Sequence, residues 1–196
     1  MTLGLVDTSN RAVRPVSELG TLVSFGNLQM TDPVINKDGD VPQTVAAMKK
    51  IVKEHHKDVA KVADKLHDKK LSRFLRNVFD FVMTYVRYEK DSAFKEQLRT
   101  PLRTLHDQRG DCDCMAILIG AILYNKNVPF NFRVAKYSEF SDFSHVYVTV
   151  PRNASFSNDG RSGSYIVLDP VIKEFDREKS FVDHKDYHVS ARMSDF

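Results

Sequence analysis

The sequence predicts an α+β fold, in which a helical N-terminal half and one buried helix pack on an antiparallel sheet. Apolar residues recur at helical spacing from Asp40 to about Tyr88, whereas alternating apolar residues dominate after Pro129. The run from Met115 to Leu123 lies between them and is apolar apart from Gly120. Such a run is typical of a helix buried on all sides. With 196 residues, the chain is long enough to bury one well-formed core.

The chain divides into an N-terminal arm and one domain. Residues 1–39 lack a helical period and contain turn-forming stretches such as TDPVINKDGD. We expect an extended arm with a short strand around residues 22–28, lying on the domain or on a partner. Residues 40–196 then form the domain, with a helical lead-in at 40–90, a catalytic core at 100–176 and a C-terminal tail. For this charged tail, a late helix and a partner-binding end both remain open.

Three helices are predicted in the lead-in. The first begins in DVPQTVAAMKKIVKEHHKD, where Asp40 is a candidate N-cap and Pro42 lies in the first turn. The stretches VAKVADKLHDKK and LSRFLRNVFDFVMTYVRYEKD repeat the helical spacing of apolar residues. The next segment, DSAFKEQLRTPLRTLHDQRG, is polar and contains Pro101. We expect it to be a loop that crosses the surface.

Three strands are predicted after the buried helix. FNFRVAKY, FSHVYVTV and SYIVLDPV alternate in polarity and are rich in β-branched and aromatic residues, with turn-forming segments between them. Within the second strand, His145 shares a face with Tyr147 and Thr149, because side chains alternate along a strand. The intervening valines face the other way.

Composition narrows the class of protein. The net charge of +3 is small, and basic and acidic residues are interleaved, so we expect no nucleic-acid partner. No run reaches the roughly 18 apolar residues of a membrane span, and the first 20 residues lack the pattern of a secretory signal. The two cysteines, Cys112 and Cys114, are too close in sequence on one helix to bridge each other. We therefore expect a cytoplasmic protein.

Cys112 is the candidate nucleophile. It directly precedes the buried helix, where unpaired backbone N–H groups and the helix dipole favour a thiolate and can bind an oxyanion. His145 is a candidate base, and Asp169 ends a strand before Pro170. If the two strands are neighbours, Asp169 can orient His145 toward Cys112, which would complete a Cys-His-Asp triad.

The two cysteines also allow other interpretations. Cys112 could be a buried structural thiol, since free cysteine is among the most buried residue types. A zinc site needs four ligands, and no second pair of cysteine or histidine residues is in range. A redox pair is disfavoured by the C-x-C spacing, and Cys114 is expected to be structural. We expect no metal and no organic cofactor.

Several motifs resemble those of the transglutaminase-like cysteine-hydrolase superfamily, whose core is papain-like. GDCDCMAILIGAILYNKNVPFNFRVAKY, HVYVTV and YIVLDPV carry the resemblance. The matching positions follow in the family's order: Gly110-Asp111-Cys112, Val128-Pro129, His145-Val146-Tyr147 and Asp169-Pro170. The helical lead-in resembles a bacterial and phage-borne branch, whose members occur among phage and prophage virion genes.

The resemblance implies a cysteine-dependent hydrolase or acyltransferase acting on a peptide or protein substrate through a thioester. Cys112 would be the nucleophile, His145 the proton shuttle and Asp169 the residue that orients the imidazole. Peptide or amide hydrolysis is favoured, since nothing marks a cleft for an amine acceptor. Asp113 and Cys114 adjoin the site, and Cys114 stands where the branch usually has an acidic residue. Gln108 is the candidate for the side chain that donates a hydrogen bond to the oxyanion.

A second hypothesis belongs to another class of protein. A virion or assembly component could keep this fold without catalysis, with the N-terminal arm binding other virion or assembly proteins. The protein would then be incorporated in a phage virion. An intact Cys-His-Asp order argues against this alternative.

Overall fold

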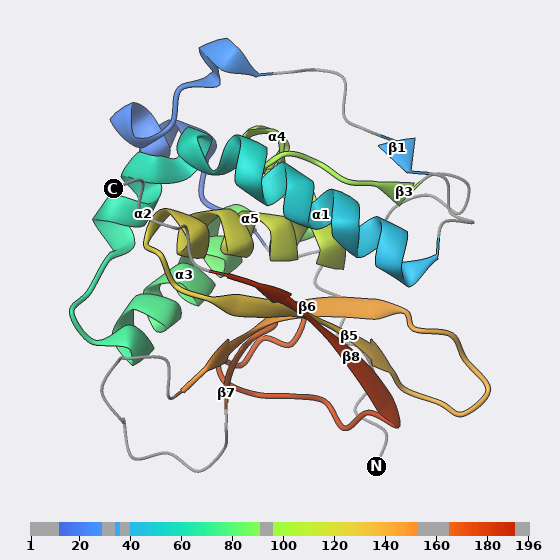
Figure 1. Cartoon of the computed structure of the whole chain (residues 1–196). Coiled ribbons are helices and arrows are strands. Elements are labelled where there is room, and N and C mark those ends of the chain that lie inside the picture. The colour runs from blue at the N-terminus through green and yellow to red at the C-terminus, as the bar shows by residue number, and fades with distance from the viewer. Residues whose placement is uncertain (1–11, 29–33, 36–39, 91–95, 153–164, 191–196) are drawn as a thin grey trace.

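The computed structural model describes residues 12–28, 34–35, 40–90, 96–152 and 165–190. Helices gather on one face of a four-stranded antiparallel sheet, so the predicted α+β class is confirmed (Figure 1). Among the described residues, no helix is long and apolar enough to cross a membrane.

The three predicted helices of the lead-in are confirmed as α1 (Val41–His55), α2 (Ala60–Leu66) and α3 (Leu71–Tyr85). A 3-10 turn, η3 (His56–Val59), leads into α2. Asp40 is the N-cap of α1, because its carboxylate accepts a hydrogen bond from the Gln43 N–H at 2.9 Å. Each helix buries an apolar stripe in the core, as the spacing predicts.

The centre of the molecule is α5 (Cys112–Asn125), which is buried at every position from Asp113 to Leu123. It lies between the sheet and the other helices (Figure 1). Gly120 lets Phe130 approach, since a Cβ at this position would lie 2.8 Å from Cζ of that ring. The helix therefore has no polar side, and its neighbours must cover it completely.

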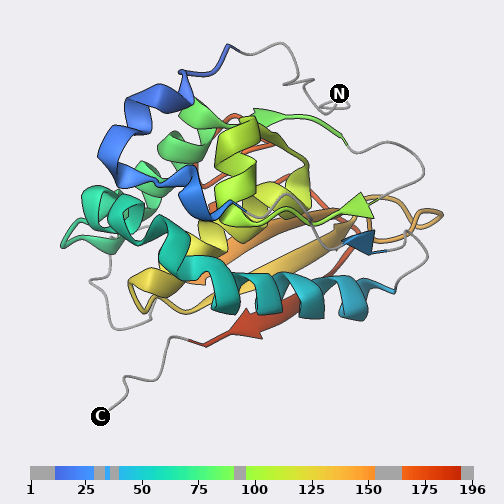
Figure 2. The ribbon, with the colours of Figure 1, turned by 90° about the horizontal axis from the view of Figure 1, so that it is seen from above.

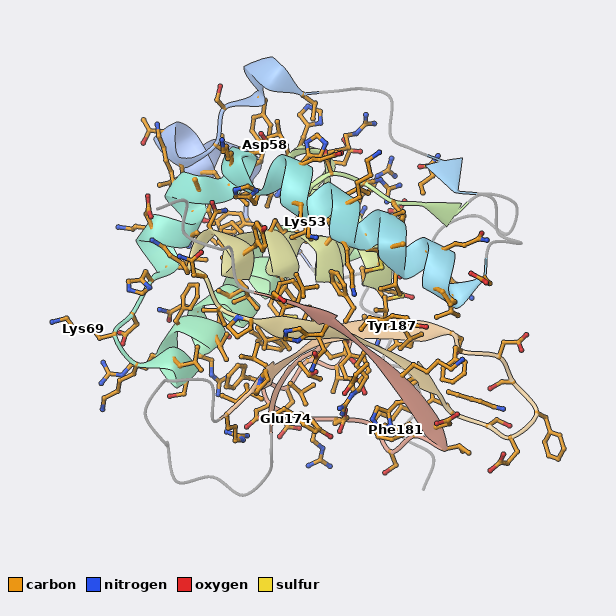
Figure 3. All side chains as sticks on the ribbon, in the orientation of Figure 1. Lys53, Asp58, Lys69, Glu174, Phe181 and Tyr187 are labelled. Atoms are coloured by element: carbon orange, nitrogen blue, oxygen red, sulfur yellow. The ribbon has the colours of Figure 1, made fainter. Side chains whose placement is uncertain are left out.

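Four strands form the main sheet, in the order β7-β6-β5-β8: β5 (Phe130–Lys136), β6 (His145–Pro151), β7 (Tyr165–Leu168) and β8 (Asp183–Val189). The valines of β6 face the helices and join the main core. Tyr147 instead belongs to a small apolar cluster with Ala135 and Val167. Phe181 packs on this second cluster, and Figure 3 shows it on the side of the sheet away from the helices.

The expected surface loop before α5 is instead largely structured. It contains α4 (Pro101–Asp107), whose N-cap Thr100 accepts a hydrogen bond from the Arg103 N–H at 3.2 Å. Pro101 begins this helix, and a proline is well suited to the first helical turn. Leu98, Leu102 and Leu105 are buried, so this segment is part of the core.

Two short strand pairs frame α4. One pairs β1 (Val34–Ile35) with β3 (Glu96–Gln97), and the other pairs β2 (Arg87–Tyr88) in parallel with β4 (Arg109–Gly110). The third helix therefore ends at Tyr85, and the two residues that follow Val86 are extended. The second pair places Tyr88 beside Gly110, two residues before Cys112.

The expected strand around residues 22–28 is wrong. Two 3-10 helices occupy this region, η1 (Val16–Leu22) and η2 (Phe25–Asn27). Leu19 and Val23 are buried in the main core, and these turns lie beside α2 and α4 (Figure 2). Residues 1–11, 29–33 and 36–39 of the expected arm lie outside the described residues, and the division at residue 39 stays a prediction.

The structure describes the C-terminal tail up to residue 190, and in this part the expectation of a late helix is also wrong. Residues 183–189 form β8, which pairs with β5 along its full length at the edge of the sheet. Most side chains of β8 are exposed, so the strand lacks the apolar alternation that would have revealed it. Tyr187 packs against the main core, and Val189 is buried there.

We expect Gly110→Ala to destabilise the protein. A Cβ at Gly110 would lie 2.6 Å from Cβ of Cys114, which the α5 backbone holds in place. Overpacking of this kind costs about 1–3 kcal/mol of unfolding free energy, measurable by urea denaturation. Gly26→Ala is the matched control, since the nearest atom there, Oγ of Ser24, is 3.8 Å away. Equal stability losses in the two variants would contradict the close packing.

Candidate active site

Cys112 is the first residue of α5, as expected. Asp111 caps the helix, because its Oδ1 accepts a hydrogen bond from the Cys114 N–H at 3.1 Å. The Cys112 side chain is partly exposed, and its sulfur interacts with the backbone N–H of Val146 in β6. The beginning of α5 and the beginning of β6 thus lie at the same end of the molecule (Figure 1).

His145 and Asp169 form a buried pair. His145 begins β6 and Asp169 follows β7, and these strands are antiparallel neighbours. Nε2 of His145 lies 2.7 Å from Oδ2 of Asp169, with residue exposures of 8% and 1%. Since a carboxylate only accepts hydrogen bonds, Nε2 carries the hydrogen, and Nδ1 is the ring atom that can take a proton from another group.

The Asp169 carboxylate is fixed by the turn after β7. Its Oδ1 accepts a hydrogen bond from the Val171 N–H at 3.1 Å, and its carbonyl accepts one from the Ile172 N–H at 3.1 Å. One carboxylate oxygen is thus bound by the backbone while the other holds the imidazole. This arrangement sets both the tautomer and the direction of the His145 ring.

A family model described as a transglutaminase-like domain matches residues 57–159. The chain belongs to this family. The matched region runs from η3 to just beyond β6 and includes Cys112 and His145, whereas Asp169 follows it. No curated protein matches the chain. The resemblance to the superfamily is confirmed, and the bacterial and phage-borne branch stays a prediction.

The electrostatic environment of Cys112 in this transglutaminase-like domain differs from the expected one. The helix start was expected to favour a thiolate, but the pKa of Cys112 is raised well above its ordinary value. Burial is the main cause, followed by the carboxylates of Asp113 and Asp111, whereas the Val146 N–H acts in the opposite direction. Asp113 Oδ1 is 3.9 Å from the sulfur. The resting form is therefore a thiol, because desolvation and negative charge outweigh the helix dipole.

Two tyrosines that the sequence analysis did not identify adjoin the site. Burial and the nearby charges of Cys112 and Asp111 raise the pKa of Tyr88 to about 12. The pKa of Tyr137 is also raised, first by burial and then by Asp169, and its ring centroid is 6.1 Å from that of His145. Both phenols stay neutral near pH 7 and can donate hydrogen bonds. Tyr88 lies in a stretch with the apolar spacing of a helix, so only the pairing of β2 with β4 could have revealed that it is close to Cys112.

The structure does not bring Gln108, the guessed oxyanion side chain, to the sulfur. Its side-chain nitrogen donates to the carbonyls of Arg14, at 2.5 Å, and Tyr85, at 3.3 Å. Its side-chain oxygen accepts the Val16 N–H at 3.2 Å. Gln108 therefore ties the N-terminal segment to the end of α3.

Cys114 is a buried thiol with local partners. Its S–H donates to the Gln97 carbonyl at 3.3 Å, and Nη1 of Arg99 lies 3.7 Å from the sulfur. The pKa of Cys114 is raised well above its ordinary value, mainly by burial. Within the described part of the chain, no group of three or more His, Cys, Asp or Glu side chains could hold a metal ion.

We expect the stabilising effect of Cys114 to depend on pH. The folded thiol stays neutral, whereas the unfolded thiol ionises near pH 9.0, so the unfolded chain binds fewer protons above that pH. Cys114→Ala should cost about 1–2 kcal/mol at pH 7. The gap to wild type should shrink by up to about 1.4 kcal/mol per pH unit above pH 9.

Urea unfolding at pH 7 and pH 10, under reducing conditions, measures this gap. A gap that is equal at both pH values would contradict the neutral, buried state of Cys114.

Proposed function

We propose that this transglutaminase-like domain is a cysteine-dependent hydrolase or acyltransferase that acts on peptide or carboxamide bonds. The observation that carries the proposal is the buried His145–Asp169 pair, 2.7 Å between Nε2 and Oδ2, at the strand end next to Cys112. A nucleophile, a base and a group that orients the base are the three parts that acyl transfer requires.

The first half of the reaction forms a thioester. The Cys112 proton passes to Nδ1 of His145, and the sulfur attacks the carbonyl carbon of the substrate. Backbone N–H groups at the beginning of α5, other than that of Cys114, which Asp111 binds, would bind the resulting oxyanion. The imidazolium then gives its proton to the leaving nitrogen, and the amine or ammonia departs.

The raised pKa of Cys112 fits this order of events. Burial and nearby carboxylates disfavour an isolated thiolate, so the sulfur ionises only as a positive charge forms beside it. An imidazolium at His145 supplies that charge, and Asp169 stabilises it. The Cys112 thiolate therefore forms in the same step as the His145 imidazolium, when the proton passes from the sulfur to the ring.

The second half of the reaction returns the enzyme to its resting state. His145 takes a proton from water as the water oxygen attacks the thioester, and the sulfur leaves with a proton from the imidazolium. An amine in place of water would give transamidation. We favour water and hence hydrolysis, with a protein or peptide as substrate.

A phage or prophage setting and binding of assembly proteins by the N-terminal segment remain predictions. In the described part of that segment, Leu19 and Val23 pack in the chain's own core. The Arg14 N–H donates to the Thr84 carbonyl at 3.0 Å, which fixes this part on the domain itself. Because these contacts bind the segment to its own domain, they do not support the non-catalytic alternative, in which the segment binds other proteins.

Acyl-enzyme trapping tests the proposed function. We expect p-nitrophenyl acetate to acetylate Cys112, detected by mass spectrometry of the intact protein and its peptides. His145→Ala should slow acetylation at least about 100-fold, because general-base assistance contributes that much or more. Cys114→Ala is the matched control and should acetylate at the wild-type rate.

Adding hydroxylamine then compares the acceptors, since a hydroxamate product reports attack by an amine and free acetate reports attack by water. Acetylation of Cys112 at the same rate in wild type and His145→Ala would contradict the proposal.

A further inference from the structure

The ring of Tyr147 lies against the ring of His145. The two centroids are 5.4 Å apart with an interplanar angle of 30°, a stacked arrangement. The two residues are separated by one position in β6, so both side chains are on the face of the sheet away from the main core. Tyr147 is 1% exposed, and its surroundings leave the ring little freedom.

The phenol of Tyr147 is anchored by a carboxylate. Its O–H donates to Oε1 of Glu178 at 2.7 Å. The Tyr165 O–H donates to Oε2 at 2.8 Å, and Nη1 of Arg133 donates to Oε1 at 2.9 Å. Arg133 is itself held by Asp186 through two contacts of 2.7 Å. Glu178 therefore has a fixed place, and it fixes the Tyr147 ring in turn.

We propose that Tyr147, anchored by Glu178, is a positioning residue that holds the His145 ring and stabilises its imidazolium form. This inference rests on the proposed function, in which His145 becomes positively charged. The face of an aromatic ring attracts a cation, and a phenol that donates to a carboxylate has a more electron-rich ring. The interaction is stronger for the imidazolium than for the neutral imidazole, so it acts when the proton has left Cys112.

Several other charged or titratable groups face His145 or the rings packed on it. Asp169 binds Nε2, and Lys179 lies over the Tyr137 ring at 4.4 Å. Tyr137 is itself titratable and lies beside the His145 ring, and Glu178 accepts the Tyr147 O–H. The charged or titratable groups near Cys112 are Asp111, Asp113 and Tyr88. Substitution of Tyr147 can remove its bond to Glu178 as well as its ring, so Tyr165→Phe, which also removes one bond to Glu178, separates the two effects.

The test is the pH dependence of Cys112 alkylation by iodoacetamide in Tyr147→Leu, Tyr147→Phe and Tyr165→Phe. Tyr165→Phe is the matched control, because it also removes one hydrogen bond to Glu178, while the ring that stacks on His145 stays. A second readout is the pH midpoint of the His145 ring signals by NMR in uniformly labelled protein. Circular dichroism confirms that each variant is folded.

We expect Tyr147→Leu to raise the midpoint of Cys112 alkylation by about 0.5–1 pH unit and to lower the His145 ring midpoint by a similar amount. Tyr147→Phe should shift both midpoints in the same directions by less, and Tyr165→Phe should leave both in place. Unchanged midpoints in folded Tyr147→Phe and Tyr147→Leu would overturn the inference. Equal shifts in Tyr165→Phe would overturn it too, because they would trace the effect to the stability of the network.

Failure of the proposed function gives a different result. If alkylation of Cys112 is the same in wild type and His145→Ala, the catalytic pair is wrong. The His145 ring midpoint still tests the contact with Tyr147 in that case. If alkylation depends on His145 but neither midpoint responds to Tyr147, only the inference about Tyr147 fails.

Discussion

The complete burial of α5 is the constraint on which the rest of the structure depends. Each large apolar side chain that leaves water contributes about 1.5–3 kcal/mol, and this helix has no polar side to expose. The sheet, whose strands follow α5 in the chain, must cover one side, and the helices that precede α5 must cover the others. Because Asp111 caps the helix at a defined residue, the same packing fixes the position of the Cys112 sulfur against β6.

The site combines a partly exposed thiol with an environment that disfavours its ionisation. Burial acts most strongly against a thiolate, and the charges of Asp113, Asp111 and Asp169 add to its effect. Asp169 also accepts the hydrogen of His145 Nε2. In the proposed reaction, it would therefore stabilise the imidazolium that forms as the thiol gives up its proton.

Much of the fold could be predicted because its signals are local. Helical spacing in the lead-in, the apolar run of α5 and the alternation in β6 each determine an element within a few residues. The sequence analysis made the contact between Asp169 and His145 conditional on neighbouring strands, and β6 and β7 are antiparallel neighbours. The features that were missed depend on tertiary packing. The helix α4 lies in a short, largely polar stretch that contains a proline, and β8 is an edge strand with exposed polar side chains.

The site residues that the sequence analysis missed also depend on tertiary packing. Tyr88 is close to Cys112 only because β2 pairs with β4, and two-residue strands leave no periodic pattern in a sequence. Gln108 is close to Cys112 in sequence, but its backbone has a φ of 52° and its side chain donates hydrogen bonds to the carbonyls of Arg14 and Tyr85. Its role is therefore structural. The raised pKa of Cys112 could not be foreseen either, since it depends on burial and on carboxylates whose placement only the fold sets.

The most direct test of the central claim, that Cys112 shares its proton with His145, is the rate of Cys112 alkylation across about pH 4 to 9. The account predicts that wild type and the exposed-site control His184→Ala are alkylated already below pH 8, because the sulfur can ionise as its proton passes to His145. It predicts a rate at least about 10-fold lower in His145→Ala, because the thiolate loses its positive partner. Slow alkylation in all three proteins that rises only above pH 9 would show an isolated buried thiol and would contradict the account.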